Sequence, residues 1–195
     1  MLHQKYDTTC LKYLFLAGER TDDATYNWLT KLLQVPVIDH WWQTESGSPM
    51  IANMAGIDLK EIKPGSASQS VFGFDIQILD ADGNPLPPNT EGAVAIKLPL
   101  PPGCLPNLWK DTNRFKQSYL SQFDGYYFSG DGGYVDEEGY FFITGRIDDI
   151  INVAGHRLST AEMEKVLASH SAVAECAVVG IVPNPSGEVP NHHSL

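Results

Sequence analysis

The chain has 195 residues, 43% of them hydrophobic, and a formal net charge of −11. That length supports one substantial core, or one domain and part of another, and the acidic balance argues against a nucleic-acid or membrane-surface role while leaving small anionic ligands open. The three cysteines are scattered and lack the spacing of a zinc site, and the first residues lack signal-peptide character. No apolar run approaches the roughly 20 residues of a membrane span. We therefore expect a soluble, cytoplasmic protein.

The first forty-odd residues read as strand, helix and strand. Segment 12–17, KYLFLA, is a short apolar run that ends at Gly18, which is typical of a buried strand. The acidic stretch 21–23 predicts a helix start, and apolar residues at helical spacing follow it. Segment 35–42, VPVIDHWW, predicts a second buried strand. This order favours an α/β layer with a parallel sheet.

The middle of the chain changes to an antiparallel pattern. Segment 63–70, KPGSASQS, reads as a loop, and segment 74–98 alternates with a period near two around a tight turn at Asp82 and Gly83. The proline-rich segment 97–107 contains no helix or central strand. Segment 125–146 predicts another strand pair punctuated by glycines. We therefore expect an antiparallel, barrel-like sheet.

The last part predicts a small α+β unit. Segment 149–153, DIINV, reads as a strand and leads to a loop. A helix is expected to begin at a cap formed by Ser159 or Thr160, with an acidic residue in its first turn. Segment 173–182 reads again as a strand.

Four segments in order then identify a family resemblance. They are LAGER at 16–20, DHWWQTESG at 39–47, YYFSGDGGYVDEEGYFFITGRIDD at 126–149 and INVAGHR at 151–157. Together they resemble the acyl-adenylate-forming enzymes and, more narrowly, the acetyl- and propionyl-CoA synthetases. The resemblance covers residues 11–181, nearly the whole chain.

The resemblance implies a two-step reaction. A carboxylate attacks the α-phosphorus of ATP, giving acyl-AMP and pyrophosphate, and the thiol of coenzyme A then displaces AMP. It also implies that residues 1–147 are the C-terminal part of the large adenylate-forming domain. Residues 148–195 begin the small C-terminal α+β domain, with a hinge at Asp148.

The motif WWQTE explains why two tryptophans precede a run of polar side chains. By the resemblance, Trp41 lies near the adenine and Trp42 walls the acyl pocket, as rigid indoles can. Gln43 and Thr44 donate hydrogen bonds to the α-phosphate or acyl oxygens. Glu45 ligates Mg²⁺, and Thr44 and Glu45 are the expected catalytic residues. The alternative for this motif alone is a buried tryptophan pair beside a polar turn.

The segment LAGER and the start of the second motif should approach the nucleotide. Gly18 permits a close backbone approach, and the resemblance implies nucleotide contacts for Gly18, Glu19 and Asp39. Arg20 stands where relatives often have proline. Ala17 lines the acyl pocket in related enzymes, and its small size favours propionate over acetate, by the roughly 1–3 kcal/mol that one methylene is worth. The alternative is that Ala17 is simply a packed residue at a strand end.

The remaining motifs supply ribose and coenzyme A contacts by the same resemblance. Asp131 is expected to accept hydrogen bonds from the ribose hydroxyls, as a carboxylate facing a cis-diol can. Arg146 meets the ribose or a phosphate. Ala154 and Gly155 lie along coenzyme A, and Arg157 contacts a phosphate. Taken singly, SGDG is an ordinary turn and a strand-end arginine is a solvated charge.

Two family features are not found in the sequence. A Ser/Thr/Gly-rich phosphate loop ending in lysine does not precede LAGER, and no lysine follows Lys165. We therefore expect an internal fragment that does not make acyl-CoA alone, because phosphate positioning dominates such catalysis. The alternatives are a catalytically dead adenylate-binding module, a structural remnant, or another adenylate-forming ligase. The Trp42 wall argues against ligases for long-chain or aryl acids.

Overall fold

The computed structural model describes residues 6–18, 21–147, 150–153, 156–168, 170, 172–173 and 176–179. The chain divides into two compact units, Met1–Ile147 and Asp148–Leu195. No helix in the described part of the chain is long and apolar enough to cross a membrane.

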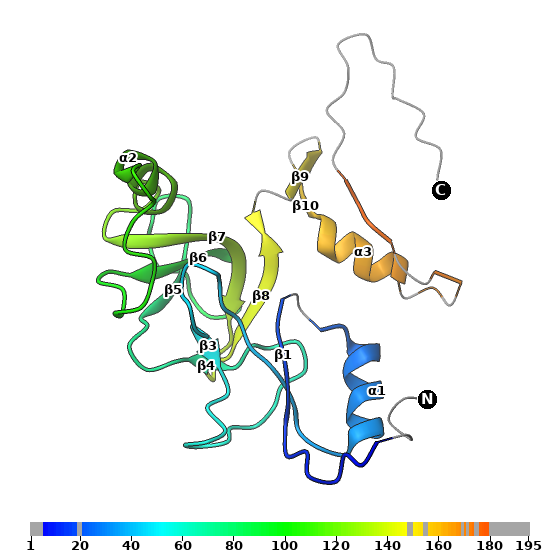
Figure 1. Ribbon diagram of the computed structural model, residues 1–195. Coiled ribbons are helices and arrows are strands. Elements are labelled where there is room, and N and C mark those ends of the chain that lie inside the picture. Colours follow the sequence, from blue (N-terminus) through cyan, green and yellow to red (C-terminus); the bar gives the residue numbers. More distant parts are fainter. Residues whose placement is uncertain are drawn as a thin grey trace. The chain divides into compact units, whose positions relative to one another are not determined.

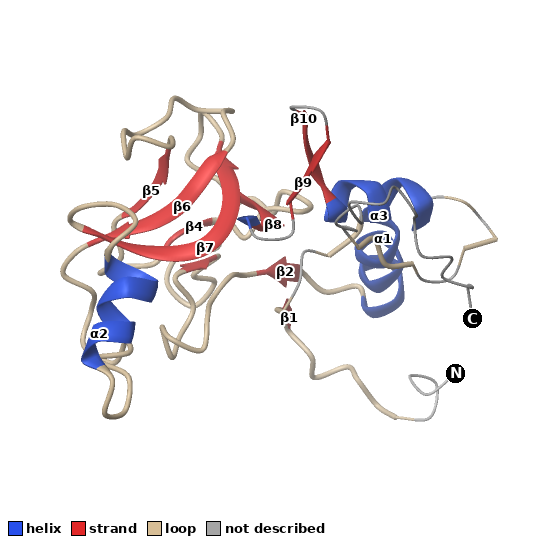
Figure 2. Ribbon diagram, turned by 90° about the horizontal axis from the view of Figure 1, so that it is seen from above, coloured by secondary structure: helices blue, strands red, loops and turns tan. Residues whose placement is uncertain are grey.

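The first unit begins with a short strand and a helix (Figure 1), which are followed by a second short strand parallel to the first (Figure 2). β1 (Leu14–Leu16) pairs in parallel with β2 (Val37–Asp39), and α1 (Asp23–Leu33) connects them. Asp22 caps α1 by accepting hydrogen bonds from the backbone N–H groups of Ala24 and Thr25, both 2.9 Å long. The predicted strand–helix–strand order is confirmed, and it places the carboxyl ends of β1 and β2 at one edge.

A curved four-stranded antiparallel sheet forms the larger part of this unit (Figure 2). Its strands, in spatial order, are β5 (Ile76–Leu79), β6 (Gly92–Lys97), β7 (Tyr126–Val135) and β8 (Phe141–Arg146). The predicted antiparallel arrangement of segments 74–98 and 125–146 is confirmed. Register shifts interrupt the pairing of β6 with β7 and of β7 with β8, as β-bulges that bend a sheet do.

The core covers both faces of β6. Val94 and Ile96, each 0% exposed, pack in one apolar cluster with Met50, while Ala93 and Ala95 pack in a second cluster. Burying a side chain such as Ile96 stabilises the fold by about 2 kcal/mol. The sheet that carries the later motifs is therefore a rigid platform.

Smaller elements border the sheet. β3 (Ile51–Ala52) pairs with β4 (Gln69–Ser70), so part of the segment 63–70 predicted as loop is strand. α2 (Thr112–Phe115) continues into η2 (Lys116–Leu120), a π-helix that the sequence reading did not predict.

The second unit contains an antiparallel strand pair and a helix. β9 (Ile150–Val153) pairs with β10 (His156–Ser159), and α3 (Thr160–Ala168) follows at once. The predicted strand and helix start are confirmed, but β10 was not predicted. The strand expected over 173–182 is wrong where it can be checked, because residues 173 and 176–179 are not in a strand.

Candidate adenylate site

Asp131 is the buried carboxylate around which the candidate site is built. It lies on β7 directly opposite Arg146 on β8, and only 7% of it is exposed. Its backbone N–H donates to Ser129 Oγ at 3.0 Å, and the Ser129 hydroxyl donates to the carbonyl of Val94 at 2.6 Å. The strand around Asp131 is thereby fixed to β6 in the core.

Two side chains of the WWQTE motif reach Asp131. Trp41 Nε1 and Gln43 Nε2 both donate to Asp131 Oδ2, at 3.1 and 2.9 Å. Trp41 lies ninety positions and Gln43 eighty-eight positions from Asp131 in the sequence. A buried carboxylate needs such donors, since an unsatisfied one would be costly. The structure therefore brings the predicted adenine motif and the predicted ribose carboxylate together.

Gln43 serves the protein rather than a ligand in this arrangement. Its amide nitrogen also donates to the carbonyl of Ser129 at 2.8 Å, and its Oε1 accepts from the hydroxyl of Tyr127 at 3.0 Å. Burial, reinforced by the nearby carboxylate of Glu45, raises the pKa of Tyr127, so the phenol stays protonated and donates. With both amide N–H groups engaged, Gln43 orients Asp131, and a direct phosphate contact from Gln43 would require breaking one of these bonds.

Arg146 lies over the backbone of β7 directly before Asp131. Its Nη1 donates to the carbonyl of Ser129 at 3.0 Å and lies 3.6 Å from Asp131 Oδ1. Gly130 has φ +78°, and a Cβ added there would lie 2.5 Å from Arg146 Nη2. Only glycine combines this conformation with room for the guanidinium. The alternative reading of SGDG as an ordinary turn is wrong, because residues 129–132 lie within β7, where the pairing with β6 is irregular.

Glu45 lies at the other end of the WWQTE motif and is held at two points. Its Oε1 accepts from the hydroxyl of Tyr119 at 2.9 Å, and its carbonyl accepts from the N–H of Leu105 at 2.6 Å. In the described part of the chain, no cluster of three or more His, Cys, Asp or Glu side chains could cage a metal. Mg²⁺ needs no cage, because one carboxylate and substrate phosphates suffice, so a half-buried, oriented Glu45 fits the predicted role.

The other predicted residues of this region lie at the surface. Thr44 and Ala17 are exposed, and Trp42 is 45% exposed. The alternative of a buried tryptophan pair is therefore wrong, since only Trp41 engages the interior. The alternative of Ala17 as a packed strand-end residue is also not supported. Exposed groups at these positions are available to a ligand.

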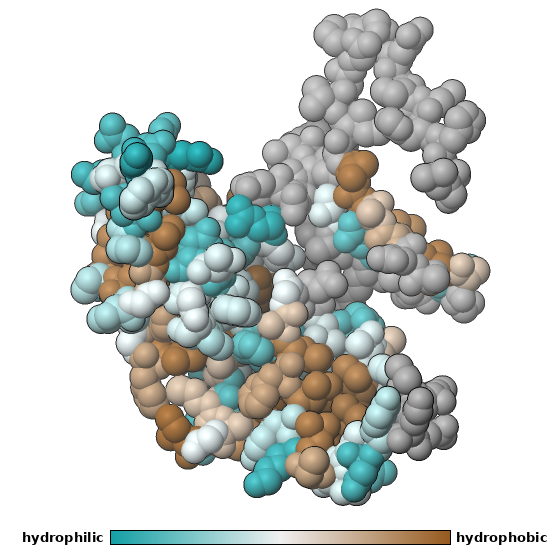
Figure 3. Space-filling view, in the orientation of Figure 1, coloured by the Kyte–Doolittle hydropathy of each residue, from teal (hydrophilic) through white to brown (hydrophobic). Residues whose placement is uncertain are grey.

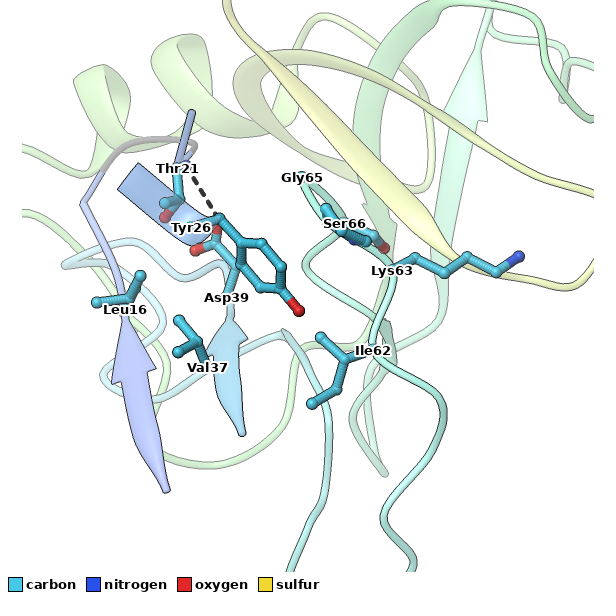
Figure 4. Close-up of a pocket in the computed structure, with 10 residues that line it drawn as sticks. Leu16, Thr21, Tyr26, Val37, Asp39, Ile62, Lys63, Gly65 and Ser66 are labelled. Atoms are coloured by element: carbon cyan, nitrogen blue, oxygen red, sulfur yellow. Dashed lines mark hydrogen bonds between the residues drawn. The ribbon is translucent and has the colours of Figure 1, made fainter. Parts of the chain in front are cut away.

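Asp39 ends β2 and fastens the loop that follows β1. Its carboxylate accepts from the N–H groups of Thr21 and His40, both at 3.1 Å, and burial raises its pKa. It also borders a small pocket whose opposite wall includes Ile62 and Ser66 (Figure 4). Asp39 thus fixes Thr21, just before α1, a role that the resemblance had not indicated.

Gly18 has φ +108°, and nothing lies within 4 Å of a Cβ built on it. This open approach is what the predicted adenine contact requires. Glu19, Asp148, Ala154 and Gly155 lie outside the described residues. Arg157 belongs to β10, where it pairs with Asn152, but its side chain is likewise outside the described part.

Sequence reasoning missed Tyr119, Tyr127 and Ser129. Tyr127 and Ser129 were inside the quoted motif YYFSGD but received no role. Their only signal was their place in a strand-like run, in which Tyr127 and every residue from Ser129 to Gly133 are buried. Tyr119 had no such signal, because a π-helix has no simple periodicity that would predict it.

Comparisons with known proteins agree with this geometry. The sequence profile of the family described as AMP-binding enzyme matches residues 1–101. The human mitochondrial acyl-CoA synthetase short-chain family member 3 is 47% identical over 190 residues, covering 97% of this chain and 28% of that protein. Propionate–CoA ligase of Escherichia coli is 44% identical over 188 residues, covering 95% of this chain and 30% of that protein.

A solved structure is similar as well. The crystal structure of an anthranilate CoA ligase in complex with anthranoyl-AMP aligns with a TM-score of 0.75 and 28% identity, covering 91% of this chain and 32% of that one. The chain thus spans about 30% of the length of the curated relatives that it matches. The family profile, the relatives and the fold agree with the assembled motifs, and the chain belongs to the AMP-binding enzymes.

Proposed function

We propose that this chain supplies the ribose- and phosphate-facing part of the active site in a short-chain carboxylate–CoA ligase. The whole protein would activate propionate or acetate with ATP as acyl-AMP and transfer the acyl group to coenzyme A. From the composition of the sequence, we also propose that the protein is soluble and cytoplasmic. A site for Mg²⁺ is a further part of the proposal.

The observation that carries the proposal is the set of contacts at Asp131. A carboxylate that is 7% exposed is oriented by two uncharged donors, Trp41 and Gln43, and lies beside the guanidinium of Arg146. The uncharged donors orient the carboxylate through Oδ2, and Arg146 lies 3.6 Å from Oδ1, so an ionised carboxylate of fixed orientation is presented as an acceptor for a cis-diol. Arg146 supplies positive charge for a phosphate.

Glu45 and Thr44 would serve the adenylation step. A bound Mg²⁺ would supply positive charge to offset the negative charge of the phosphates. Glu45 would hold that ion with its Tyr119-oriented carboxylate. Thr44, exposed beside it, would donate a hydrogen bond to a phosphate or acyl oxygen.

The substrate class rests on the acyl side of the motif and on the relatives. Trp42 would close the acyl pocket, and Ala17 would leave room for propionate. One relative is named a propionate–CoA ligase and another a short-chain acyl-CoA synthetase. The second half-reaction would use Gly155 and Arg157 of the second unit, with Ala154 beside coenzyme A and a hinge at Asp148.

A series of adenylate mimics tests the substrate class on the purified chain. We expect the propionyl mimic to bind best, and the butyryl mimic about tenfold more weakly, because one methylene is worth roughly 1–3 kcal/mol in a closed pocket. Ala17→Leu should move the preference toward the acetyl mimic, with Ala55→Leu as the control. Equal binding of propionyl and anthranoyl mimics would contradict the short-chain assignment, and failure of AMP itself to bind would contradict the adenylate site.

A further inference from the structure

Tyr119 is the one side chain of η2 that reaches the candidate metal ligand. Its hydroxyl donates to Glu45 Oε1 at 2.9 Å, across seventy-four positions of sequence. Single π-helical turns occur frequently at functional sites, because they re-aim a side chain that an α-helix would direct elsewhere. Here the π-turn Lys116–Leu120 follows directly on α2 and carries Tyr119 in its fourth position.

The ring of Tyr119 is held firmly enough to position a partner. It stacks on the ring of Tyr127 with centroids 5.5 Å apart and planes 7° apart, and it also contacts Phe115 with centroids 5.7 Å apart. Tyr127 is only 2% exposed. Stacking of this kind fixes both torsions of the ring, so the hydroxyl is presented to Glu45 from a defined point.

We propose that Tyr119 is a positioning residue, whose hydroxyl holds the carboxylate of Glu45 in the orientation that binds Mg²⁺ with the phosphates of ATP. This inference rests on the proposed function and adds a residue to which neither the motifs nor the comparisons assign a role. A carboxylate held by one hydrogen bond at Oε1 is turned to offer its remaining lone pairs in one direction.

The same aromatic pair joins the metal ligand to the ribose carboxylate. Tyr127, beneath Tyr119, donates to Gln43 at 3.0 Å, and Gln43 in turn donates to Asp131 at 2.9 Å. Glu45 and Asp131 are therefore positioned by neighbouring members of one stacked network. Both half-sites would then have a fixed geometry before ATP arrives, which reduces the cost of ordering them on binding.

A purely structural Tyr119 would behave differently. The ring packs against the apolar core, and Tyr119→Phe keeps that packing and the stack on Tyr127. If the hydroxyl only stabilised the fold, its loss would lower the unfolding midpoint and leave the Mg²⁺ dependence of ATP binding as it was. The two roles therefore separate in a single variant.

The test is calorimetric titration of the purified chain with ATP over a series of Mg²⁺ concentrations. For Tyr119→Phe we expect the Mg²⁺ concentration for half-maximal ATP binding to rise by at least about tenfold, near the lower end of the range for a hydrogen bond to a charged group. Binding of metal-free AMP should not change. Tyr134→Phe is the matched control, because it also removes a tyrosine hydroxyl from a stacked ring pair, in this case Tyr134 and Phe142.

A double variant shows whether Tyr119 acts through Glu45. In the Glu45→Gln background, Tyr119→Phe should cause no further change in the Mg²⁺ requirement. An unchanged requirement in the single variant, or an additive effect in the double variant, would overturn the inference while the wild-type titration still supports the adenylate site. A wild-type chain that binds neither AMP nor ATP would overturn the proposed function, and the inference with it.

Discussion

The hairpin of β7 and β8 carries two aspartates in opposite surroundings. Asp131 is 7% exposed and is held by the uncharged donors Trp41 and Gln43. Asp136, in the turn of the same hairpin, accepts from the ammonium of Lys63 at 2.6 Å. Asp131 is oriented by uncharged donors and has the guanidinium of Arg146 3.6 Å away, whereas Asp136 makes a direct ion pair with Lys63.

The contacts of Asp136 have a structural purpose. Its Oδ1 accepts from the backbone N–H groups of Glu138 and Tyr140, at 2.9 and 2.8 Å, which fixes the turn. The ammonium of Lys63 also lies 4.3 Å from the centroid of the Tyr140 ring. A carboxylate whose oxygens are directed into its own turn has little left for a ligand, so charge alone does not mark the functional aspartate.

The largest effect on stability is expected at Gly133, where β7 packs closely against β8 and β6. A Cβ at Gly133 would lie 2.6 Å from the carbonyl oxygen of Phe142 and 3.1 Å from Val94 Cγ2. Gly133→Val should therefore lower the free energy of unfolding by about 3 kcal/mol and abolish ligand binding as well. Urea denaturation measures it, with Gly56→Ala as control because nothing lies within 4 Å there. A Gly133 variant of normal stability would contradict the packing described.

Asp136→Ala should separate stability from binding. It removes one charged and two backbone contacts, so we expect a loss of about 2 kcal/mol in the free energy of unfolding. Affinity for AMP should stay within about twofold of wild type, because the effects of distant residues without shared partners are independent of one another. Glu137→Ala, at an exposed neighbour, is the control. A drop in AMP affinity comparable to that of a site variant would show that the two ends of the hairpin are coupled.

Gln43→Leu should have the opposite effect and weaken AMP binding more than it lowers stability. It leaves the carboxylate of Asp131 without one donor and the hydroxyl of Tyr127 without its acceptor. We expect AMP to bind about tenfold more weakly, and the free energy of unfolding to fall by about 1 kcal/mol. Gln77→Leu, on β5, is the control for a neutral amide. Unchanged AMP affinity would mean that Asp131 needs no orientation from Gln43.

The smallest effect is a pH dependence of stability at Asp136. Burial raises its pKa, but the hydrogen bond from Lys63 and those from the backbone of Tyr140 and Glu138 together lower it below the ordinary aspartate value. Its stabilisation is therefore full above the unfolded pKa, about 3.9, and is lost as pH falls through the folded pKa. The stability gap between wild type and Asp136→Asn should stay constant from about pH 7 to 5 and narrow below about pH 4. A gap that widens in acid would contradict the ion pair.

The sequence predicted the elements better than the contacts between them. Alternation over β5 to β8 and the apolar runs of β1 and β2 carried enough signal, because each reports burial within a few neighbouring residues. β10 and η2 were missed, since short strands and π-turns depend on their tertiary partners. Segment 173–182 has strand composition, yet residues 173 and 176–179 are not in a strand.

In the candidate site, too, the residues could be predicted from the sequence better than the contacts between them. The sequence identified Trp41, Gln43, Glu45, Asp131 and Arg146 as candidates, and the structure brings four of them into one set of contacts around Asp131. It could not show that the amide of Gln43 is directed at Asp131, because that pairing joins residues eighty-eight positions apart. The position of Glu45 beside Tyr119 depends on η2, which local periodicity does not encode.

The most direct measurement is calorimetric titration of the purified chain with a non-hydrolysable propionyl-adenylate mimic, comparing wild type with Asp131→Ala. Loss of the oriented carboxylate should weaken binding about 100-fold, the upper range for hydrogen bonds to a charged group. Asp136→Ala, from the structural end of the hairpin, should bind like wild type. Equal affinity of the Asp131→Ala variant and the wild type would show that Asp131 does not hold the ribose and would contradict the proposed adenylate site.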